Sequence, residues 1–377
     1  MNAWHPLLRL PPLLDGRRSP TPAEALLLAA LTPLGRLYGH LQRLRAGLYA
    51  RGLRPRYRAP VPVISVGNLA SGGTGKTPLV LWLAERLRET GRHPAIISRG
   101  YGQAARGAVT VVADARGLRL HPPQAADEPY LMARRLPGVP VLTAPQRGAG
   151  IRQALATPPC GVILLDDAFQ HLPVARDLDL VLLDAARPWG NGQCLPAGSL
   201  REPPSALARA HWVILTRCDA AGDPTATRRL LERHAPGRPL LECRHRPRDW
   251  LPLDGAPPRP LEQPPPGPLL PFCAIARPDS FAATLAGLGV DTLPLTAFPD
   301  HHPLPPATLA TLVARARAQG AQGLICTEKD LVKLDARRNW GLPIHALTLE
   351  LTFAAPPTAL LARIDDLFST GDQRPAA

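Results

Sequence analysis

A glycine-rich segment between an apolar strand and a helix carries the clearest chemical signal in the sequence. It reads Gly67-Asn68-Leu69-Ala70-Ser71-Gly72-Gly73-Thr74-Gly75-Lys76-Thr77-Pro78. Such a loop turns its N–H groups inward, and the helix that follows adds its positive end, so the segment is typical of a phosphate-binding loop. We expect Lys76 to reach the β- and γ-phosphates of a nucleotide and the Thr77 hydroxyl to bind Mg²⁺. The predicted nucleotide-binding residues are Ser71, Gly72, Gly73, Thr74, Gly75, Lys76 and Thr77.

The loop departs from the usual pattern at one position. In G-x-x-x-x-G-K-T the first residue is glycine, whereas this chain has Ala70 there. The alternative interpretation is a glycine-rich turn beside an unrelated lysine. The agreement of the loop, the lysine, the hydroxyl and the flanking elements favours the phosphate loop.

A pair of carboxylates follows a second apolar strand. Val162–Leu165 are all aliphatic, and Asp166 and Asp167 come directly after them. A hydrophobic strand that ends in aspartate is the Walker B arrangement, which holds Mg²⁺ or its water ligands. The alternative is that the two aspartates cap the next segment, a position that aspartate favours. Together with the upstream loop, the pair predicts a Mg²⁺ site formed by Thr77, Asp166 and Asp167.

Composition limits the class of protein and the kind of partner. The 377 residues are enough for two domains, and 45% hydrophobic with 20% charged residues is typical of a globular chain. The net charge of +14 favours anionic partners. Because the basic residues are spread out and match no nucleic-acid motif, phosphate and lipid are favoured over RNA or DNA. None of the six cysteines forms a C-x-x-C pair, which argues against disulfides or zinc and fits a reducing cytosol.

Lysine is rare in this basic chain. Of 44 basic residues only Lys76, Lys329 and Lys333 are lysines. A GC-rich genome explains the excess of arginine, but the remaining lysines could mark positions where a guanidinium fails. The spacing of Lys329 and Lys333 places both on one face of a helix. Either Lys329 lies at the mouth of a cleft between domains and neutralises phosphate, or it forms an ordinary surface pair with Glu328 or Asp335.

Residues 23–50 are predicted to form an amphipathic helix. Its apolar stripe repeats every three or four residues, and arginines flank it. The stripe consists of Leu34, Leu37, Leu41, Leu44 and Leu48. The uncharged run from Ala25 to Gly35 is too short to span a bilayer, which needs about 20 residues. Without a clear cleavage site it is not read as a secretory signal. The helix therefore either packs on the core or lies in a membrane interface facing anionic lipid.

Strand and helix patterns alternate after residue 61. Apolar strands separated by helical stretches indicate an α/β fold, specifically a P-loop NTPase-like, doubly wound, mostly parallel sheet. A proline-dense stretch then precedes a second, smaller α/β unit. We expect an N-terminal arm with the amphipathic helix (1–58), a P-loop core domain (59–248), a linker (249–271), a C-terminal α/β domain (272–368) and a tail (369–377).

An ordered series of motifs between residue 61 and about residue 334 resembles the tetraacyldisaccharide 4′-kinase (lipid A 4′-kinase) family. The matching segments are Val66-Gly67-Asn68 with Gly72–Pro78, Ser98-Arg99-Gly100-Tyr101-Gly102, Asp127-Glu128-Pro129, Asp166–His171, Arg176-Asp177-Leu178-Asp179, Gly190-Asn191-Gly192, Leu195-Pro196-Ala197-Gly198, Leu200-Arg201-Glu202-Pro203, Phe298-Pro299-Asp300-His301-His302 and Thr327-Glu328-Lys329-Asp330. Ala126, Ala168 and the first residue of Ala274–Pro278 stand where the family usually has glycine, so the site geometry is expected to shift slightly.

The resemblance implies an activity and roles for further residues. It implies transfer of the ATP γ-phosphoryl group to the 4′-hydroxyl of a tetraacyldisaccharide 1-phosphate to form lipid IVA. It also implies that Mg²⁺ is required and that the protein is associated with the cytoplasmic face of the inner membrane. We expect the protein to be a monomer. By analogy Asp127 is the base for the sugar hydroxyl, His301 its partner, and Glu202 helps to position Mg²⁺. The resemblance leaves open whether His301 or His302 faces Asp127, and Asp127 could instead cap a helix that begins just after it.

Two other classes of protein share parts of the pattern. Regulatory ATPases of the ParA/MinD type have a similar loop, but their signature lysine before the glycine pair is Ser71 here. Thr216-Arg217-Cys218-Asp219 faintly resembles the guanine-reading T-K-x-D of GTPases, with Arg217 in place of the lysine. Both differences favour the kinase.

Overall fold

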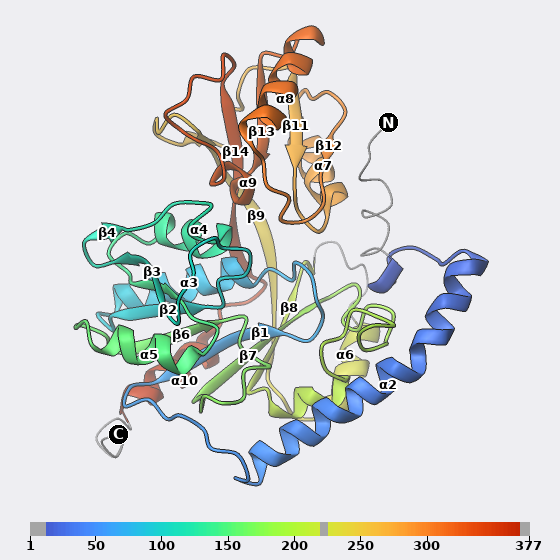
Figure 1. The fold of residues 1–377 in the computed structure, drawn as a ribbon, viewed down its shortest axis with the longest axis vertical. Coiled ribbons are helices and arrows are strands. Elements are labelled where there is room, and N and C mark those ends of the chain that lie inside the picture. Colours follow the sequence, from blue (N-terminus) through green and yellow to red (C-terminus); the bar gives the residue numbers. More distant parts are fainter. Residues whose placement is uncertain (1–12, 219–224, 370–377) are drawn as a thin grey trace.

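The computed structural model describes residues 13–218 and 225–369, which form two stacked α/β units (Figure 1). A core unit carries the phosphate loop, and a smaller unit sits on it. The beginning of the expected N-terminal arm and nearly all of the expected tail lie outside the described residues. Within the described ranges no helix is both long and apolar enough to cross a bilayer.

The core unit is built on a mostly parallel sheet. Its strands lie in the order β8-β7-β1-β6-β2-β5-β3-β4, and only β3 and β4 run antiparallel to their neighbours. The central strands are buried along their whole length, as expected of parallel strands covered on both faces. The strands are β1 (Val63–Asn68), β2 (Pro94–Ser98), β3 (Thr110–Asp114), β4 (Gly117–Leu118), β5 (Val141–Thr143), β6 (Val162–Asp166), β7 (Leu178–Asp184) and β8 (Trp212–Thr216).

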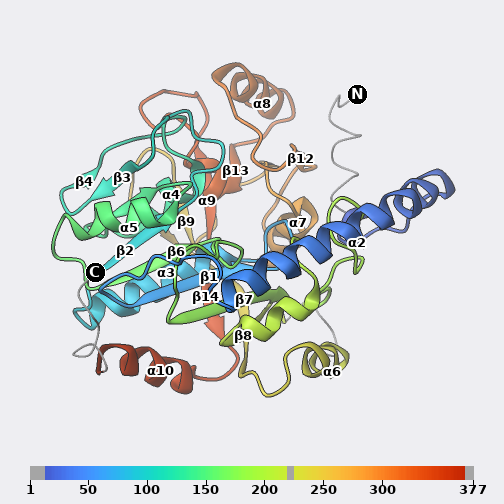
Figure 2. The ribbon, with the colours of Figure 1, turned by 60° about the horizontal axis from the view of Figure 1, so that its bottom comes forward.

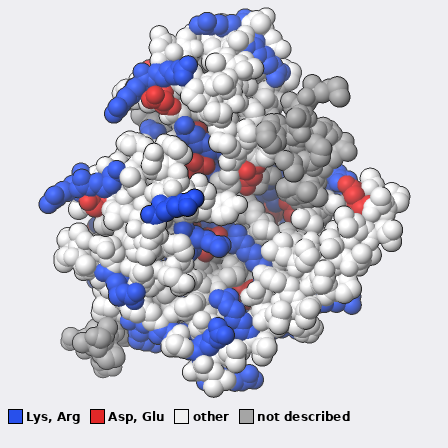
Figure 3. Space-filling model, viewed as in Figure 1, with Lys and Arg blue, Asp and Glu red and all other residues white. Residues whose placement is uncertain are grey.

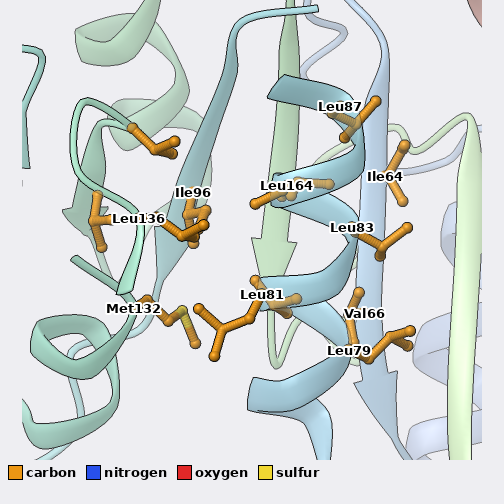
Figure 4. Close-up of a cluster of buried hydrophobic side chains, with 14 of the residues drawn as sticks. Ile64, Val66, Leu79, Leu81, Leu83, Leu87, Ile96, Met132, Leu136 and Leu164 are labelled. Atoms are coloured by element: carbon orange, nitrogen blue, oxygen red, sulfur yellow. The ribbon is translucent and has the colours of Figure 1, made fainter. Parts of the chain in front are cut away.

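Helices cover the core sheet and fix the loops at its carboxyl edge. Leu79, Leu83 and Leu87 of α3 point onto β1 and β6, where Ile64 and Leu164 meet them (Figure 4). Their spacing of four residues puts all three on one face of the helix. The helices of this unit are α3 (Lys76–Glu89), α4 (Asp127–Arg135), α5 (Arg147–Leu155), the 3₁₀ helix η1 (Pro204–Arg209) and α6 (Thr225–His234). This packing anchors the phosphate loop, which connects β1 to α3.

A two-stranded ribbon joins the units. The long strand β9 (Leu240–Pro252) pairs with β8 of the core and then, antiparallel, with β14 (Ile344–Phe353) of the smaller unit. The other elements of the smaller unit are β10 (Arg259–Pro260), β11 (Leu269–Cys273), α7 (Pro278–Gly287), β12 (Thr296–Ala297), α8 (Pro306–Ala318), β13 (Gly323–Thr327) and α9 (Glu328–Leu331). The doubly wound fold with a smaller second α/β unit is thereby confirmed.

The structure differs from the expected domain boundaries in two places. Residues 249–252 complete β9, so the link between the units is the β9–β14 ribbon and not the proline-rich stretch as a whole. The last helix, α10 (Thr358–Ser369), returns to the core unit, where Leu360, Ile364 and Leu367 join its hydrophobic cluster. Apolar burial decides both differences, because these segments are stabilised by partners that are distant in sequence.

The predicted amphipathic helix is α2 (Pro22–Ala50), which runs along the outer side of the core unit with its N-terminal end extending past the sheet (Figures 1 and 2). Thr21 and Glu24 form a capping box at its start. Gly35 and Gly39 pack on Cys194, and a Cβ at Gly35 would lie 2.7 Å from the Cys194 carbonyl oxygen. The leucine stripe is directed away from this contact: Leu34, Leu37, Leu41 and Leu44 are each 53–59% exposed.

Candidate active site

A cavity of about 1160 Å³ lies between the two units. Figure 3 shows basic and acidic side chains close together in the hollow between the upper and lower parts of the molecule. Five segments contribute most of the charged or phosphate-loop residues used below: 72–77, 126–128, 166–167, 300–301 and 327–329. Its size and mixed lining are typical of a small-molecule site.

The phosphate loop has the conformation that its glycines predict. Gly75 has φ of +85° and is the N-cap of α3, so the helix begins at Lys76. The backbone angle favours glycine there, and a Cβ would also force the ring of His245 on β9 to move. The Asn68 side chain donates to the Thr74 hydroxyl (2.9 Å) and the Ala70 carbonyl (2.6 Å), which holds the loop from below.

The predicted nucleotide-binding residues do not all face the cavity. Gly72, Gly73, Thr74, Gly75, Lys76 and Thr77 line it. Ser71 is not among the lining residues: its N–H and its hydroxyl both donate to the Ser199 carbonyl, at 2.7 and 2.9 Å. Ser71 therefore ties the loop to a neighbouring segment.

The aspartate pair lies beside the phosphate loop because β6 and β1 are parallel neighbours. Lys76 Nζ is 3.4 Å from Asp167 Oδ1, and Arg201 Nη1 donates to both Asp167 oxygens at 2.8 and 2.9 Å. The charges of Lys76 and Arg201 outweigh the effect of burial and lower the pKa of Asp167 far below its usual value. Asp167 also has φ of +49°, a backbone conformation that is strained for a residue with a Cβ and is often found at functional sites.

Asp166 has the properties of a metal-binding carboxylate. Its Oδ2 accepts from the Ser98 hydroxyl (2.8 Å), while its buried Oδ1 has no hydrogen-bond partner among the described residues. Burial, together with the charges of Glu128 and Asp167, raises the pKa of Asp166 to about 7. A cation at this point would stabilise the ionised pair, so the residues present fit Mg²⁺. The described part of the chain holds no cluster of three His, Cys, Asp or Glu side chains suited to a metal, so a complete cage from these side chains is absent there.

Asp127 and His301 meet across the gap between the units. Asp127 is the first residue of α4, and His301 Nδ1 is 3.6 Å from its Oδ2. His302 instead stacks on Phe298, with ring centroids 5.2 Å apart. Burial alone would raise the pKa of Asp127, but the contact with His301 and the charge of Lys333 outweigh it and lower that pKa. The N-cap of α4 is Ala126, without a side-chain capping bond, so the alternative of Asp127 as the cap is not observed.

Both remaining lysines contact carboxylates of this region. Lys333 Nζ is 2.9 Å from Asp330 Oδ1 and 3.6 Å from Asp127 Oδ2. Lys329 lines the cavity, and its Nζ is 3.1 Å from Glu128 Oε1. Burial lowers the pKa of Lys329, but the neighbouring carboxylates outweigh this effect and raise it above its usual value. The interpretation of Lys329 as a surface pair with Glu328 or Asp335 does not match these contacts, since Glu328 pairs with Arg135.

Glu202, like Ser71, is a predicted site residue that does not line the cavity. Its side chain is only 3% exposed and pairs with Arg209, at 2.8 and 3.0 Å. Both carboxylate oxygens are thus engaged by one guanidinium on η1. The assignment of Glu202 to Mg²⁺ stays a prediction without a supporting contact among the described residues.

Three further residues belong to the site although their roles were not predicted. Arg147, 2% exposed, donates to the carbonyl oxygens of Asp166 and Asp167 at 3.2 and 3.3 Å and so supports the turn that carries them. Glu128 lines the cavity and Arg201 binds Asp167. Two of them lie in segments that match the family, Glu128 in Asp127-Glu128-Pro129 and Arg201 in Leu200–Pro203, and that was the available signal. Arg147 gave no signal, because its contacts depend on the position of α5.

Comparisons with known proteins agree with one another. The family model described as tetraacyldisaccharide-1-P 4′-kinase matches residues 27–369. A tetraacyldisaccharide 4′-kinase of Anaeromyxobacter dehalogenans (strain 2CP-C) is 45% identical over 322 residues, 85% of this chain and 84% of the relative. One from Syntrophotalea carbinolica is 44% identical over 336 residues, covering 88% and 90%. The crystal structure of LpxK from Aquifex aeolicus in complex with ATP is 30% identical, with a TM-score of 0.73, and covers 91% of this chain and 99% of that chain.

Proposed function

The chain belongs to the tetraacyldisaccharide-1-P 4′-kinase family, and from this premise we propose that it transfers the γ-phosphoryl group of ATP to the 4′-hydroxyl of tetraacyldisaccharide 1-phosphate, forming lipid IVA. The observation that carries the proposal is a single cavity lined by the phosphate loop, the aspartate pair and the Asp127–His301 contact. Within the part of the chain that the structure describes, no contact favours the regulatory ATPase. Arg217, the residue that replaces the GTPase lysine, is bound to Asp184 and to the Gly73 carbonyl, and Asp219 lies outside the described residues.

The proposed reaction assigns a task to each group. The 4′-oxygen forms a bond to the γ-phosphorus as the bond from that phosphorus to the β,γ-bridging oxygen breaks, and Asp127 accepts the hydroxyl proton. Lys76 and the N–H groups of 72–77 stabilise the charge on the transferring group and on the ADP that leaves. Arg201 and Arg147 hold Asp167 and the turn around it in place. Mg²⁺, when bound by Thr77, Asp166 and Asp167, would neutralise phosphate charge. Incubation with γ-labelled ATP and the purified acceptor tests the proposal directly, and absence of labelled lipid would contradict it.

Replacing the aspartates should reveal the metal site. We expect Asp166→Asn to lower kcat and to shift the Mg²⁺ titration to higher concentration, because the amide removes the charge at the unpartnered Oδ1. Asp167→Asn should do the same, with an added loss from the disturbed Lys76 and Arg201 contacts. Calorimetric titration of ADP with and without Mg²⁺ gives a readout apart from turnover. Asp114→Asn, which breaks an exposed pair with Arg119, is the control. Unchanged Mg²⁺ dependence in both site variants would refute the assignment.

We further propose that α2 lies in a membrane interface at the cytoplasmic face, where the acylated substrate would be found. The exposed leucines Leu34, Leu37, Leu41 and Leu44 support this, because an apolar stripe on one side of a basic helix binds anionic bilayers. The interpretation of the helix as wholly core-packed does not explain the exposed stripe. A monomer remains our expectation.

Replacing Leu37, Leu41 and Leu44 with serine should release the protein from vesicles of anionic lipid. KM for the lipid acceptor should rise, and KM for ATP should stay the same, because these exposed leucines are not among the residues that line the cavity. Vesicle sedimentation and kinetics measure both effects. Leu118→Ser, an exposed leucine on β4, is the matched control. A fall in melting temperature with loss of both substrates would favour core packing, since each buried leucine truncation costs about 2–5 kcal/mol.

A further inference from the structure

The ammonium group of Lys329 has three acceptors in the structure. Its Nζ lies 3.1 Å from His301 Nε2, 3.1 Å from Glu128 Oε1 and 3.4 Å from Asp300 Oδ1. An ammonium group has three N–H donors and no lone pair, so each proton can be directed to one of these atoms. The side chain is 20% exposed, and Lys329 lines the cavity together with all three of these partners.

These contacts determine where His301 carries its proton. Because Lys329 can only donate, the imidazole nitrogen that faces it must offer a lone pair. A neutral imidazole has one N–H, which is then on the other nitrogen, and that nitrogen faces Asp127 at 3.6 Å. The conclusion follows from the ring orientation, in which Nε2 faces the ammonium group and Nδ1 faces Asp127.

We propose that Lys329 is a positioning residue that fixes the tautomer of His301, with the ring proton directed at Asp127. His301 then acts as a donor that orients the Asp127 carboxylate, and Asp127 alone accepts the proton of the hydroxyl. This inference rests on the proposed function for the identity of the hydroxyl group that Asp127 deprotonates. The tautomer of His301 itself is independent of that function.

The position of Lys329 in the fold gives this arrangement a second consequence. Lys329 and His301 belong to the smaller unit, whereas Asp127 and Glu128 begin α4 of the core. The Glu128 contact holds Lys329 at the boundary of the units, so the correct tautomer and the approach of His301 to Asp127 arise together. A planar guanidinium cannot direct protons at three acceptors around one atom, which gives a reason for lysine in a chain rich in arginine. With its three protons used in this way, Lys329 has a role other than phosphate neutralisation, which was one of the two interpretations that the sequence left open.

Nuclear magnetic resonance of the full chain with ¹⁵N-labelled histidine tests the proposal. Long-range ¹H–¹⁵N correlation distinguishes the two tautomers, and His301→Gln identifies the His301 signals by their loss. We expect wild-type His301 to be neutral with its proton on Nδ1. In Lys329→Met the Nε2–H tautomer of His301 should appear. We expect kcat to fall roughly 10- to 100-fold, which is less than the full rate contribution of a general acid or base, while KM for ATP changes little.

Two further variants separate positioning from simple stabilisation. Lys329→Arg keeps a donor opposite Nε2, so it should retain the tautomer and restore part of kcat. Arg135→Met removes a different ion pair between the units, that with Glu328, and should leave the tautomer unchanged. A wild-type proton on Nε2, or an unchanged tautomer in Lys329→Met, would overturn the proposal. If the tautomer is as expected but the lipid is not phosphorylated, the inference on His301 stands and the proposed function fails.

Discussion

Lys76→Ala is expected to abolish phosphoryl transfer while the protein remains folded. The side chain extends from the first turn of α3 into the cavity, 12% exposed, where the phosphates of a nucleotide would meet both its charge and the N-terminal end of the helix. Stabilisation of this kind is worth about 3–4 kcal/mol for a single donor, and a full charge at the transferring group is expected to matter at least as much. We therefore expect kcat to fall by roughly 10³-fold or more.

The fold should survive this change because of the neighbouring charges. Among residues 13–218 and 225–369 Lys76 forms an ion pair with Asp167 alone, at 3.4 Å, and that carboxylate keeps its shorter contacts to Arg201. Removing Lys76 therefore leaves no unpaired buried charge, which is the usual cause of a large loss of stability. Circular dichroism should show a melting temperature close to that of the wild type. Lys76→Met, which keeps the aliphatic stem, separates loss of charge from loss of packing. Near-normal kcat in either variant would contradict the phosphate-loop assignment.

Much of the core could be predicted because its signals are local. The apolar runs 61–66 and 162–165 predict strands, which the structure has at Val63–Asn68 and Val162–Asp166, and the glycine-rich loop predicts the start of the helix that follows. The helix after the loop begins at Lys76 because Gly75 adopts a left-handed conformation at the N-cap. The ribbon was missed because β9 mixes buried and half-exposed residues and is stabilised by β14, which lies far along the chain.

The residues of the site likewise fall into those that local sequence signals predict and those that depend on contacts distant in sequence. Lys76, Asp166 and Asp167 could be placed together from sequence, because parallel strands bring their carboxyl ends to one edge. The contact between Asp127 and His301 was implied only by the family resemblance, since no spacing rule connects the two units. The role of Glu202 was carried over from the family motif Leu200–Pro203. Nothing in the sequence of that motif indicates that Arg209 binds the Glu202 side chain.

The scarcity of lysine proved informative. Lys76, Lys329 and Lys333 each contact a carboxylate of the proposed site. Composition alone could not say whether the rare lysines face phosphates or the protein's own side chains. That distinction depends on which acceptors surround each ammonium group, and the fold provides them.

Substitutions of Asp127 and of His301 are expected to lower kcat in a non-additive way, because the two residues act together. A sugar hydroxyl is a poor nucleophile until a base accepts its proton, and such groups contribute about 10²–10⁴-fold. Asp127→Asn removes the acceptor, and His301→Gln removes the donor that orients it, so each should lower kcat far more than it raises KM. Because both substitutions disable one proton transfer, the double variant should cost little beyond the worse single change.

The pH dependence should distinguish the two single variants. Contact with His301 and the charge of Lys333 hold the pKa of Asp127 below its ordinary value despite burial. A lowered pKa keeps the base ionised as the pH falls, so at saturating Mg²⁺ the acid limb that Asp127 contributes to kcat/KM should lie below the ordinary carboxyl range, apart from any step due to Asp166, whose pKa is raised to about 7. His301→Gln removes one lowering influence, so its acid limb should move to higher pH. Asp127→Asn should lose that limb altogether.

His302→Gln is the matched control for the pair, because His302 stacks on Phe298 and its neighbour in sequence, His301, makes the contact with Asp127. It should leave kcat and the acid limb close to wild type, although the lost stacking can lower the melting temperature. Steady-state kinetics of the three single variants and the Asp127/His301 double variant, measured across pH, complete the test. Fully additive losses for Asp127 and His301 would show that the two act independently, and an acid limb that His301→Gln leaves in place would show that His301 does not tune the base.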